Sequence, residues 1–289
     1  MNLKPEFLVF VPLLLMFPAS CNQSTNKEHL KSISEKTPDL NLDPASDPII
    51  QAATELFVAL KYREAESLIR QRLAHYERLR GKNNDTVICL TINLADCMYR
   101  QDNFTGAEPL LLHSIGYFEA SESNELALAR AYSLLAGVYA KTSRREQAIP
   151  LYEQAIEIAE AIVGVESPTV SMYMSDLALV YRKENKGELA VTLQRRVLEM
   201  LQKTVASDDP NLATAYNNLA TTYLTLGKRD DAEPLYRNAL EIREKVYGSR
   251  HESLYSILKN LANICAATGR LADAQRLSKR ADNNKGSQE

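Results

Sequence analysis

Alanine recurs along this chain at a spacing of about 42 residues, in two interleaved series. The second series lies 12 residues after the first in every unit, and one step between units is 41 residues where the others are 42. The two series are Ala53, Ala95, Ala136, Ala178, Ala220 and Ala262, then Ala65, Ala107, Ala148, Ala190, Ala232 and Ala274. Such a period indicates a repeat protein, in which each unit buries its apolar face only by stacking on its neighbours.

One unit, residues 210–248, shows what each repeat is expected to fold into. An Asp-Pro pair at its start suits a helix cap followed by the first helical position. Apolar residues then recur at helical spacing up to Tyr223, Gly227 interrupts the pattern, and a second amphipathic run continues to Gly248. The sequence therefore predicts a helical hairpin, with small residues placed where the two backbones approach closely.

The small, aromatic, small pattern, with Tyr139, Tyr181 and Tyr223 beside the alanines, resembles tetratricopeptide repeats. The 42-residue form, with NNLATTY and LGKRDDAEPLYRNALEIREKVYG in the fifth unit, is similar to the repeats of kinesin light chains and their bacterial relatives. The resemblance covers roughly residues 46–283 and is closest in the fifth and third units. It implies an all-α fold, a right-handed α-solenoid of about six helical hairpins. For function it implies little, because repeats of this type serve many unrelated partners.

The repeat domain is expected to span residues 48–283, with a polar tail at 284–289. We place the turn of its first hairpin at residues 61–63. Proline two residues after the second-series alanine, at Pro109, Pro150 and Pro234, predicts a slight bend near the start of a helix and no break. A net charge of −3 without a long Lys/Arg run excludes nucleic acid as the expected partner.

Residues 1–21 have the features of an export signal. Lys4 precedes an 11-residue apolar run, Phe7 to Phe17, which is too short to span a bilayer that needs about 20 apolar residues. The following Pro-Ala-Ser-Cys resembles a bacterial lipoprotein signal, which implies acylation of Cys21, although Pro18 stands where that family usually has leucine. A simple cleaved secretory peptide, in which Cys21 has no role, is the alternative.

Residues 22–47 are polar and contain few large apolar side chains, so we interpret them as a disordered tether. With a lipid anchor before it, the tether would hold the repeats away from a membrane in the bacterial cell envelope, facing the periplasm or the exterior. A disordered N-terminus without a role is the alternative.

No motif for catalysis, a cofactor or a metal stands out in the sequence, so we predict a protein that is not an enzyme. The four histidines, His29, His75, His113 and His251, have no cysteine or second histidine at metal-ligand spacing. His251 is expected to cap a helix. Cys265 replaces the tyrosine of other units and is expected in the core, whereas Cys89 and Cys97 lie too far apart on one helix to pair.

In a tetratricopeptide stack, first-helix residues that face away from the second helix line a concave groove. By the alanine register these candidates are Asn93, Arg100, Arg130, Lys141, Lys183, Asn217, Asn218, Lys259, Asn260 and Asn263. Asn93, Asn218 and Asn260 share one position, and in the resembled family such asparagines hold the backbone of an extended peptide. An amide donates and accepts at once, so it can bind a peptide bond. Leu134 and Asp176 occupy this position in the third and fourth units and interrupt the series.

Lys141 and Lys183 lie one repeat apart and, with Arg130, would favour a partner segment that is acidic or that ends in a free carboxylate. The alternative is that these asparagines and lysines are ordinary solvated side chains of a scaffold. Two functions follow. The first is a non-catalytic, membrane-tethered scaffold that binds an extended peptide segment in the groove, and the second is an envelope assembly factor or pilotin-like lipoprotein that works through its convex or terminal surfaces.

Overall fold

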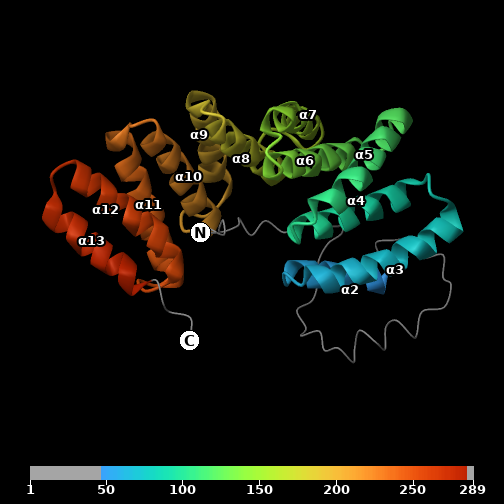
Figure 1. Cartoon of the computed structure of the whole chain (residues 1–289), viewed down its shortest axis with the longest axis horizontal. Coiled ribbons are helices and arrows are strands. Elements are labelled where there is room, and N and C mark those ends of the chain that lie inside the picture. The colour runs from blue at the N-terminus through green and yellow to red at the C-terminus, as the bar shows by residue number, and fades with distance from the viewer. Residues whose placement is uncertain (1–46, 285–289) are drawn as a thin grey trace. The chain divides into compact units, whose positions relative to one another are not determined.

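The computed structural model describes residues 47–284. The signal, Cys21 and the tether up to residue 46 lie outside the described residues. Helices with short connections make up the described part, and no strand occurs between residues 47 and 284 (Figure 1). This part forms two compact units, residues 47–163 and residues 164–284, and each is described by itself.

The first unit contains three helical hairpins, in which consecutive helices pack against each other. Its helices are α2 (Pro48–Val58), α3 (Tyr62–Arg80), α4 (Asp85–Arg100), α5 (Phe104–Ser121), α6 (Glu125–Lys141) and α7 (Arg145–Val163). The second unit contains three more hairpins built in the same way. Its helices are α8 (Pro168–Lys183), α9 (Gly187–Thr204), α10 (Pro210–Thr225), α11 (Arg229–Tyr247), the short 3-10 helix η2 (Glu252–Leu254), α12 (Tyr255–Ala267) and α13 (Leu271–Asn283).

The alanine register predicted from the sequence is confirmed. All twelve alanines of the two series are buried, with exposed fractions of 9% or less. Tyr181 and Tyr223, expected beside them, are also buried. Small side chains thus let the two helices of a hairpin approach, and the aromatic rings fill the remaining space.

The helix ends follow the local sequence signals. Asp209 Oδ1 accepts a hydrogen bond from the Asn211 amide at 2.7 Å and caps α10, and Gly227 takes a positive φ of 76° in the turn that follows this helix. His251 Nδ1 accepts from the Ser253 amide at 3.2 Å, which confirms its predicted capping role. The three prolines lie inside α5, α7 and α11, and these helices continue through them as expected.

The edges of the fold differ from the predicted boundaries by a few residues. The first turn ends earlier than expected, because α3 begins at Tyr62. Asp47, which we had placed in the tether, is fully buried and caps α2 through a 2.9 Å hydrogen bond from the Ile49 amide. Its carboxylate also accepts from Arg72 and from Tyr76 of α3.

Asn284, which we had placed in the tail, is 1% exposed, and its Nδ2 donates to the Ser249 carbonyl at 3.3 Å. A capping side chain carries no apolar periodicity, so the pattern alone does not place such a residue inside the fold.

Candidate peptide-binding face

The first helices of the second and third repeats, α4 and α6, contact each other directly. Arg130 of α6 donates from Nη1 to Asn93 Oδ1 at 2.6 Å and from Nη2 to Asp96 Oδ2 at 3.0 Å. Arg100 Nε bonds the other oxygen of Asp96 at 3.2 Å. Asn93 and Asp96 are both almost fully buried. These four side chains therefore form one network inside the protein.

Each of Asn93, Arg130 and Arg100, predicted to face a bound peptide, thus makes at least one hydrogen bond within α4 and α6, and their role in peptide binding stays a prediction. The two helices also meet at Gly137, where an added Cβ would lie 3.1 Å from the Tyr99 hydroxyl. We call this surface, formed by α4 and α6 around Asp96, the closed face. The sequence could not reveal it, since the acidic partner lies in a different repeat from Arg130.

Repeats four to six place Asn260 differently from the expectation. Its Nδ2 donates to the Tyr236 hydroxyl at 3.0 Å, and that hydroxyl lies 2.9 Å from Thr221 Oγ1. Tyr236 is fully buried and comes from α11, which packs against both α10 and α12. Asn260 therefore holds α12 against α11 through this tyrosine.

Lys259 contacts its own second helix, which we did not predict, and its role in peptide binding stays a prediction. Its ammonium donates to Ser278 Oγ at 3.0 Å and pairs with Asp282 at 2.8 Å, and both partners lie on α13. A long flexible side chain can reach an acceptor beside the face that its Cα occupies, which residue spacing does not predict.

Asn217 and Asn218 of α10 are half-buried, and Asn217 Oδ1 is buried without a hydrogen-bond partner in the described part of the chain. Asn263 is exposed on α12. Lys141 and Lys183 are exposed at the ends of α6 and α8, which belong to different units. The predicted pairing of these two lysines is therefore not tested.

Arg182 of α8, which we did not predict as a site residue, is half-buried with its Nε enclosed and unbonded. No carboxylate between residues 47 and 284 pairs with it, and burial lowers the pKa of its guanidinium. A sequence signal existed, because the equivalent positions of three other units carry Ala140, Leu224 and Ala266. The other two units carry Phe57 and Tyr99 there, so Arg182 is the only charged residue at this position of the six repeats.

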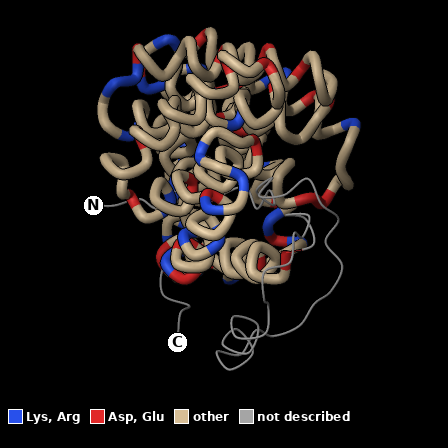
Figure 2. Tube along the Cα trace, turned by 90° about the vertical axis from the view of Figure 1, so that its right-hand side faces the viewer, with Lys and Arg blue, Asp and Glu red and all other residues tan. Residues whose placement is uncertain are grey.

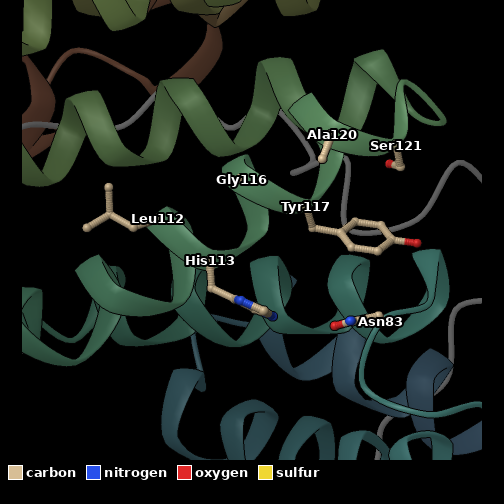
Figure 3. A pocket seen from close by; sticks show the side chains of 7 residues that line it. All are labelled: Asn83, Leu112, His113, Gly116, Tyr117, Ala120 and Ser121. Carbon is tan, nitrogen blue, oxygen red and sulfur yellow. The ribbon is translucent and has the colours of Figure 1, made fainter.

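A second surface lies on α5, where a hollow of about 440 Å³ opens beside the α3–α4 connection (Figure 3). Its lining residues are Asn83, Leu112, His113, Gly116, Tyr117, Ala120 and Ser121. Helix α5 carries no Lys or Arg, and both of its glutamates are bonded, Glu108 to Arg144 and Glu119 to Tyr132. The exposed side of α5 therefore presents no Lys or Arg and no unbonded glutamate.

The described residues offer little support for a catalytic thiol, a metal site, a charged binding patch or a membrane span. Burial raises the pKa of the Cys89 thiol to about 11 and that of Cys97 to about 12, so neither is a thiolate nucleophile at neutral pH. No group of His, Cys, Asp and Glu within residues 47–284 is arranged to hold a metal ion. Basic and acidic residues are interspersed along the helices (Figure 2). None of the helices from α2 to α13 has the length and apolarity that crossing a bilayer requires.

Comparison with known families identifies the repeats. The sequence profile of the tetratricopeptide repeat matches residues 127–203 and 211–281, together just over half of the chain. The chain belongs to the tetratricopeptide repeat family. A tetratricopeptide repeat fold is a scaffold for protein–protein interaction, and its members are generally not catalysts. A comparison of the sequence with curated proteins finds no match.

Several solved structures share the fold, among them structures of the kinesin light chain type. BtubC (BKLC) from P. vanneervenii aligns with a TM-score of 0.65 and 24% identity, over 78% of this chain and 89% of that one. The nearly identical repeats of a kinesin light chain-like protein from P. anserina align with a TM-score of 0.60 and 23% identity, over 68% of this chain and 93% of that one. The apo form of RapI aligns with a TM-score of 0.59 and 11% identity, over 82% and 96% of the two chains.

Proposed function

We propose that this tetratricopeptide repeat protein is an exported, membrane-tethered scaffold that binds an extended segment of a partner protein without catalysis. The segment would lie across the first helices of repeats four to six, α8, α10 and α12. The observation that carries the proposal is the pair Asn217 and Asn218, whose side-chain amides make no hydrogen bond with another described residue. On the closed face, by contrast, the equivalent groups are used within the protein.

An asparagine amide that is half-buried and unpaired loses hydrogen bonds to water on folding, and a bound peptide bond would restore them. Asn218 would bind the backbone of a segment of any sequence. Asn217, whose Oδ1 is enclosed, would donate from its Nδ2 to a peptide carbonyl. The preference for acidic segments, which we expected from Lys141 and Lys183 with Arg130, loses the contribution of Arg130, whose guanidinium bonds Asn93 and Asp96.

Photocrosslinking in cells tests this proposal. With a photoreactive amino acid at position 218, we expect capture of one partner through an extended or terminal segment, identified by mass spectrometry. The Asn217→Ala variant should weaken that capture about ten-fold, as the loss of a buried hydrogen bond implies. A probe at Arg229, which is exposed on the second helix α11, serves as the control. Crosslinks from position 229 and none from 218 would contradict the proposal.

The membrane tether is supported by the N-terminal sequence alone, and Cys21 lies outside the described residues. We expect mass spectrometry of the mature protein to find an acylated Cys21 as its first residue. Replacing Cys21 by Ser should then release the protein from the membrane fraction. An unmodified chain that starts elsewhere would support the simple secretory peptide instead.

The alternative function, an envelope assembly factor or pilotin-like lipoprotein, is favoured by the uncharged hollow on α5. Gly116 offers a clean test there, because an added Cβ meets nothing within 4 Å. Gly116→Arg should leave the fold intact and block docking at the hollow. If this variant loses the partner while Asn217→Ala keeps it, the working surface is α5 and not the first helices.

A further inference from the structure

We propose that residues 38–44 of this chain bind in the hollow on α5 and cover it until a partner displaces them. These residues lie outside the described part, so the inference is carried by the hollow, by the charges at its edge and by the point where the chain enters the fold. It goes beyond the proposed function, because it does not depend on what the first helices bind.

The hollow presents an apolar surface with neutral polar groups beside it (Figure 3). Leu112, Gly116 and Ala120 follow one another at intervals of four residues, so they share one face of α5. Leu112 is 49% exposed, and an added Cβ at Gly116 meets nothing within 4 Å. The volume of about 440 Å³ lies within the roughly 300 to 1,000 Å³ of pockets that enclose small ligands, so it can hold two leucine side chains.

Cations lie at one end of the hollow, where α3 ends and its connection to α4 begins. Residues 78–86 contain three basic side chains and one acidic side chain. Arg80 and Lys82, which we call the rim cations, are exposed, and neither forms an ion pair with a carboxylate of residues 47–284. The acidic side chain, Asp85, accepts from the Tyr117 hydroxyl at 2.8 Å. An acidic segment therefore suits this end of the hollow.

The chain that precedes the described part enters the fold at the same end of this unit. Asp47 accepts from the Tyr76 hydroxyl at 3.2 Å, and the Arg80 guanidinium lies 5.3 Å from the centre of the Tyr76 ring. Arg80 is the last residue of α3, and Asn83, which lines the hollow, follows in the connection. Residues 41–46 can reach roughly 20 Å at about 3.3 Å each, whereas neighbouring helices lie about 8 to 10 Å apart. The chain before Asp47 is therefore long enough to pass the end of α3 and reach α5.

The sequence Pro-Asp-Leu-Asn-Leu-Asp-Pro at 38–44 matches the hollow in its apolar and its charged groups. Proline disfavours a helical conformation of the residue before it, and alternating apolar and polar residues are typical of an extended segment. In an extended segment Leu40 and Leu42 share one side, and Asp39 and Asp43 share the other. The leucines would enter the hollow, and the aspartates would face the rim cations.

No other stretch of residues 22–46 combines these features. Its remaining large apolar side chains, Leu30 and Ile33, are three residues apart and stand among three lysines. Residues 285–289 contain no large apolar side chain. Charge and apolar pattern together therefore select residues 38–44 as the occupant.

Binding of this segment would affect both the hollow and the tether. A partner that docks on α5 would first have to displace residues 38–44, which lowers its apparent affinity. The free part of the tether would shrink to residues 22–37, so the repeats would lie nearer to the proposed membrane anchor.

Photocrosslinking within the purified full chain tests the inference. A photoreactive amino acid replaces Gly116, where there is open space for a side chain. We expect a crosslink to the tryptic peptide 37–61 of the same molecule, which mass spectrometry locates within residues 38–44. The yield should stay constant when the protein is diluted, because both parts belong to one chain.

A matched pair of double variants tests the leucines. Leu40→Asp with Leu42→Asp should lower the crosslink yield about ten-fold or more, because the apolar contact with the hollow is lost. Leu30→Asp with Ile33→Asp should leave the yield unchanged.

A second matched pair tests the rim cations. Lys82→Glu should lower the yield about three-fold, the size of effect expected of an exposed ion pair. Lys61→Glu changes an exposed lysine before the other end of α3 and should have no effect.

A labelled synthetic peptide of residues 37–45 gives an independent measurement. It should bind the Leu40→Asp, Leu42→Asp protein, whose hollow is vacant, about ten-fold more tightly than the wild type, whose hollow is occupied. Adding Gly116→Arg to that double variant should abolish binding of the peptide.

Several results would overturn the inference. These are a crosslink from position 116 to a second molecule or to residues 22–36, and the absence of any product within the chain. Equal yields in the two double variants, or equal affinity of the peptide for the wild type and the vacated protein, would overturn it as well.

Discussion

Single residues on neighbouring repeats join consecutive hairpins through arginine–glutamate pairs. Arg270 bonds both carboxylate oxygens of Glu233, at 2.9 and 2.5 Å, and Arg237 bonds one of them at 2.7 Å. Arg144 likewise donates to both carboxylate oxygens of Glu108, and each of these two hydrogen bonds is 2.7 Å long. The hydrogen bonds from Arg270, and then those from Arg237, lower the pKa of Glu233 to about 2.

The lowered pKa of Glu233 makes part of the free energy of unfolding depend on pH. Because its folded-state pKa lies below the unfolded value of about 4.3, the contribution is complete above about pH 5 and is lost as the pH falls toward 2. We expect Glu233→Gln to lower the free energy of unfolding by about 1 kcal/mol at pH 7, after allowance for solvent screening. Urea unfolding at pH 7, 4 and 2.5 measures the difference, which should shrink toward zero at the lowest pH.

Glu241→Gln provides the control, because Glu241 is exposed on the same helix. Its effect should be small at every pH. A Glu233→Gln effect that stays constant from pH 7 to pH 2.5 would contradict the role given to the pair.

The positions of the helices can be predicted from the sequence. The directions of their long polar side chains cannot. Capping residues, a positive-φ glycine and apolar spacing place the hairpins to within a few residues, because these signals act over one or two turns. The partners of Arg130, Asn260 and Lys259 lie on other helices, at distances that depend on packing. Residue spacing therefore does not predict the hydrogen-bond partners of these side chains.

The close approach of α4 and α6 gives a prediction for these two elements. Gly137→Leu should destabilise the protein by about 1 to 3 kcal/mol, because the new side chain meets the Tyr99 ring. Gly116→Leu is the matched control, since it stands on an exposed helix face with nothing near its Cβ. That variant should be neutral or more stable by up to about 1 kcal/mol through helix propensity. Equal melting temperatures for the two variants would mean that α4 and α6 do not meet at Gly137.

For the molecule as a whole, stability in a repeat fold is a sum over neighbouring hairpins. Ala220→Leu should overpack α10 and cost about 1 to 3 kcal/mol. Hydrogen exchange should then quicken in α10 and in α9 and α11, which pack against it, while residues 47–163 keep their protection.

A change in the first unit at an alanine of the second series, Ala107→Leu, should instead quicken exchange in α5 and in α4 and α6 beside it, while residues 164–284 keep their protection. Exchange that rises evenly over both units in either variant would argue against nearest-neighbour stability. An unchanged melting temperature in Ala220→Leu would contradict the alanine register itself.

The buried carboxylate of Asp47 has a mechanical consequence. Any pulling force transmitted through residues 1–46 enters the described fold at this residue. Its side chain holds the start of α2 and, at the same time, Arg72 and Tyr76 of α3. The force is therefore shared from the first residue between α2 and α3. Separating α2 from α3 requires breaking an ion pair that is almost fully buried.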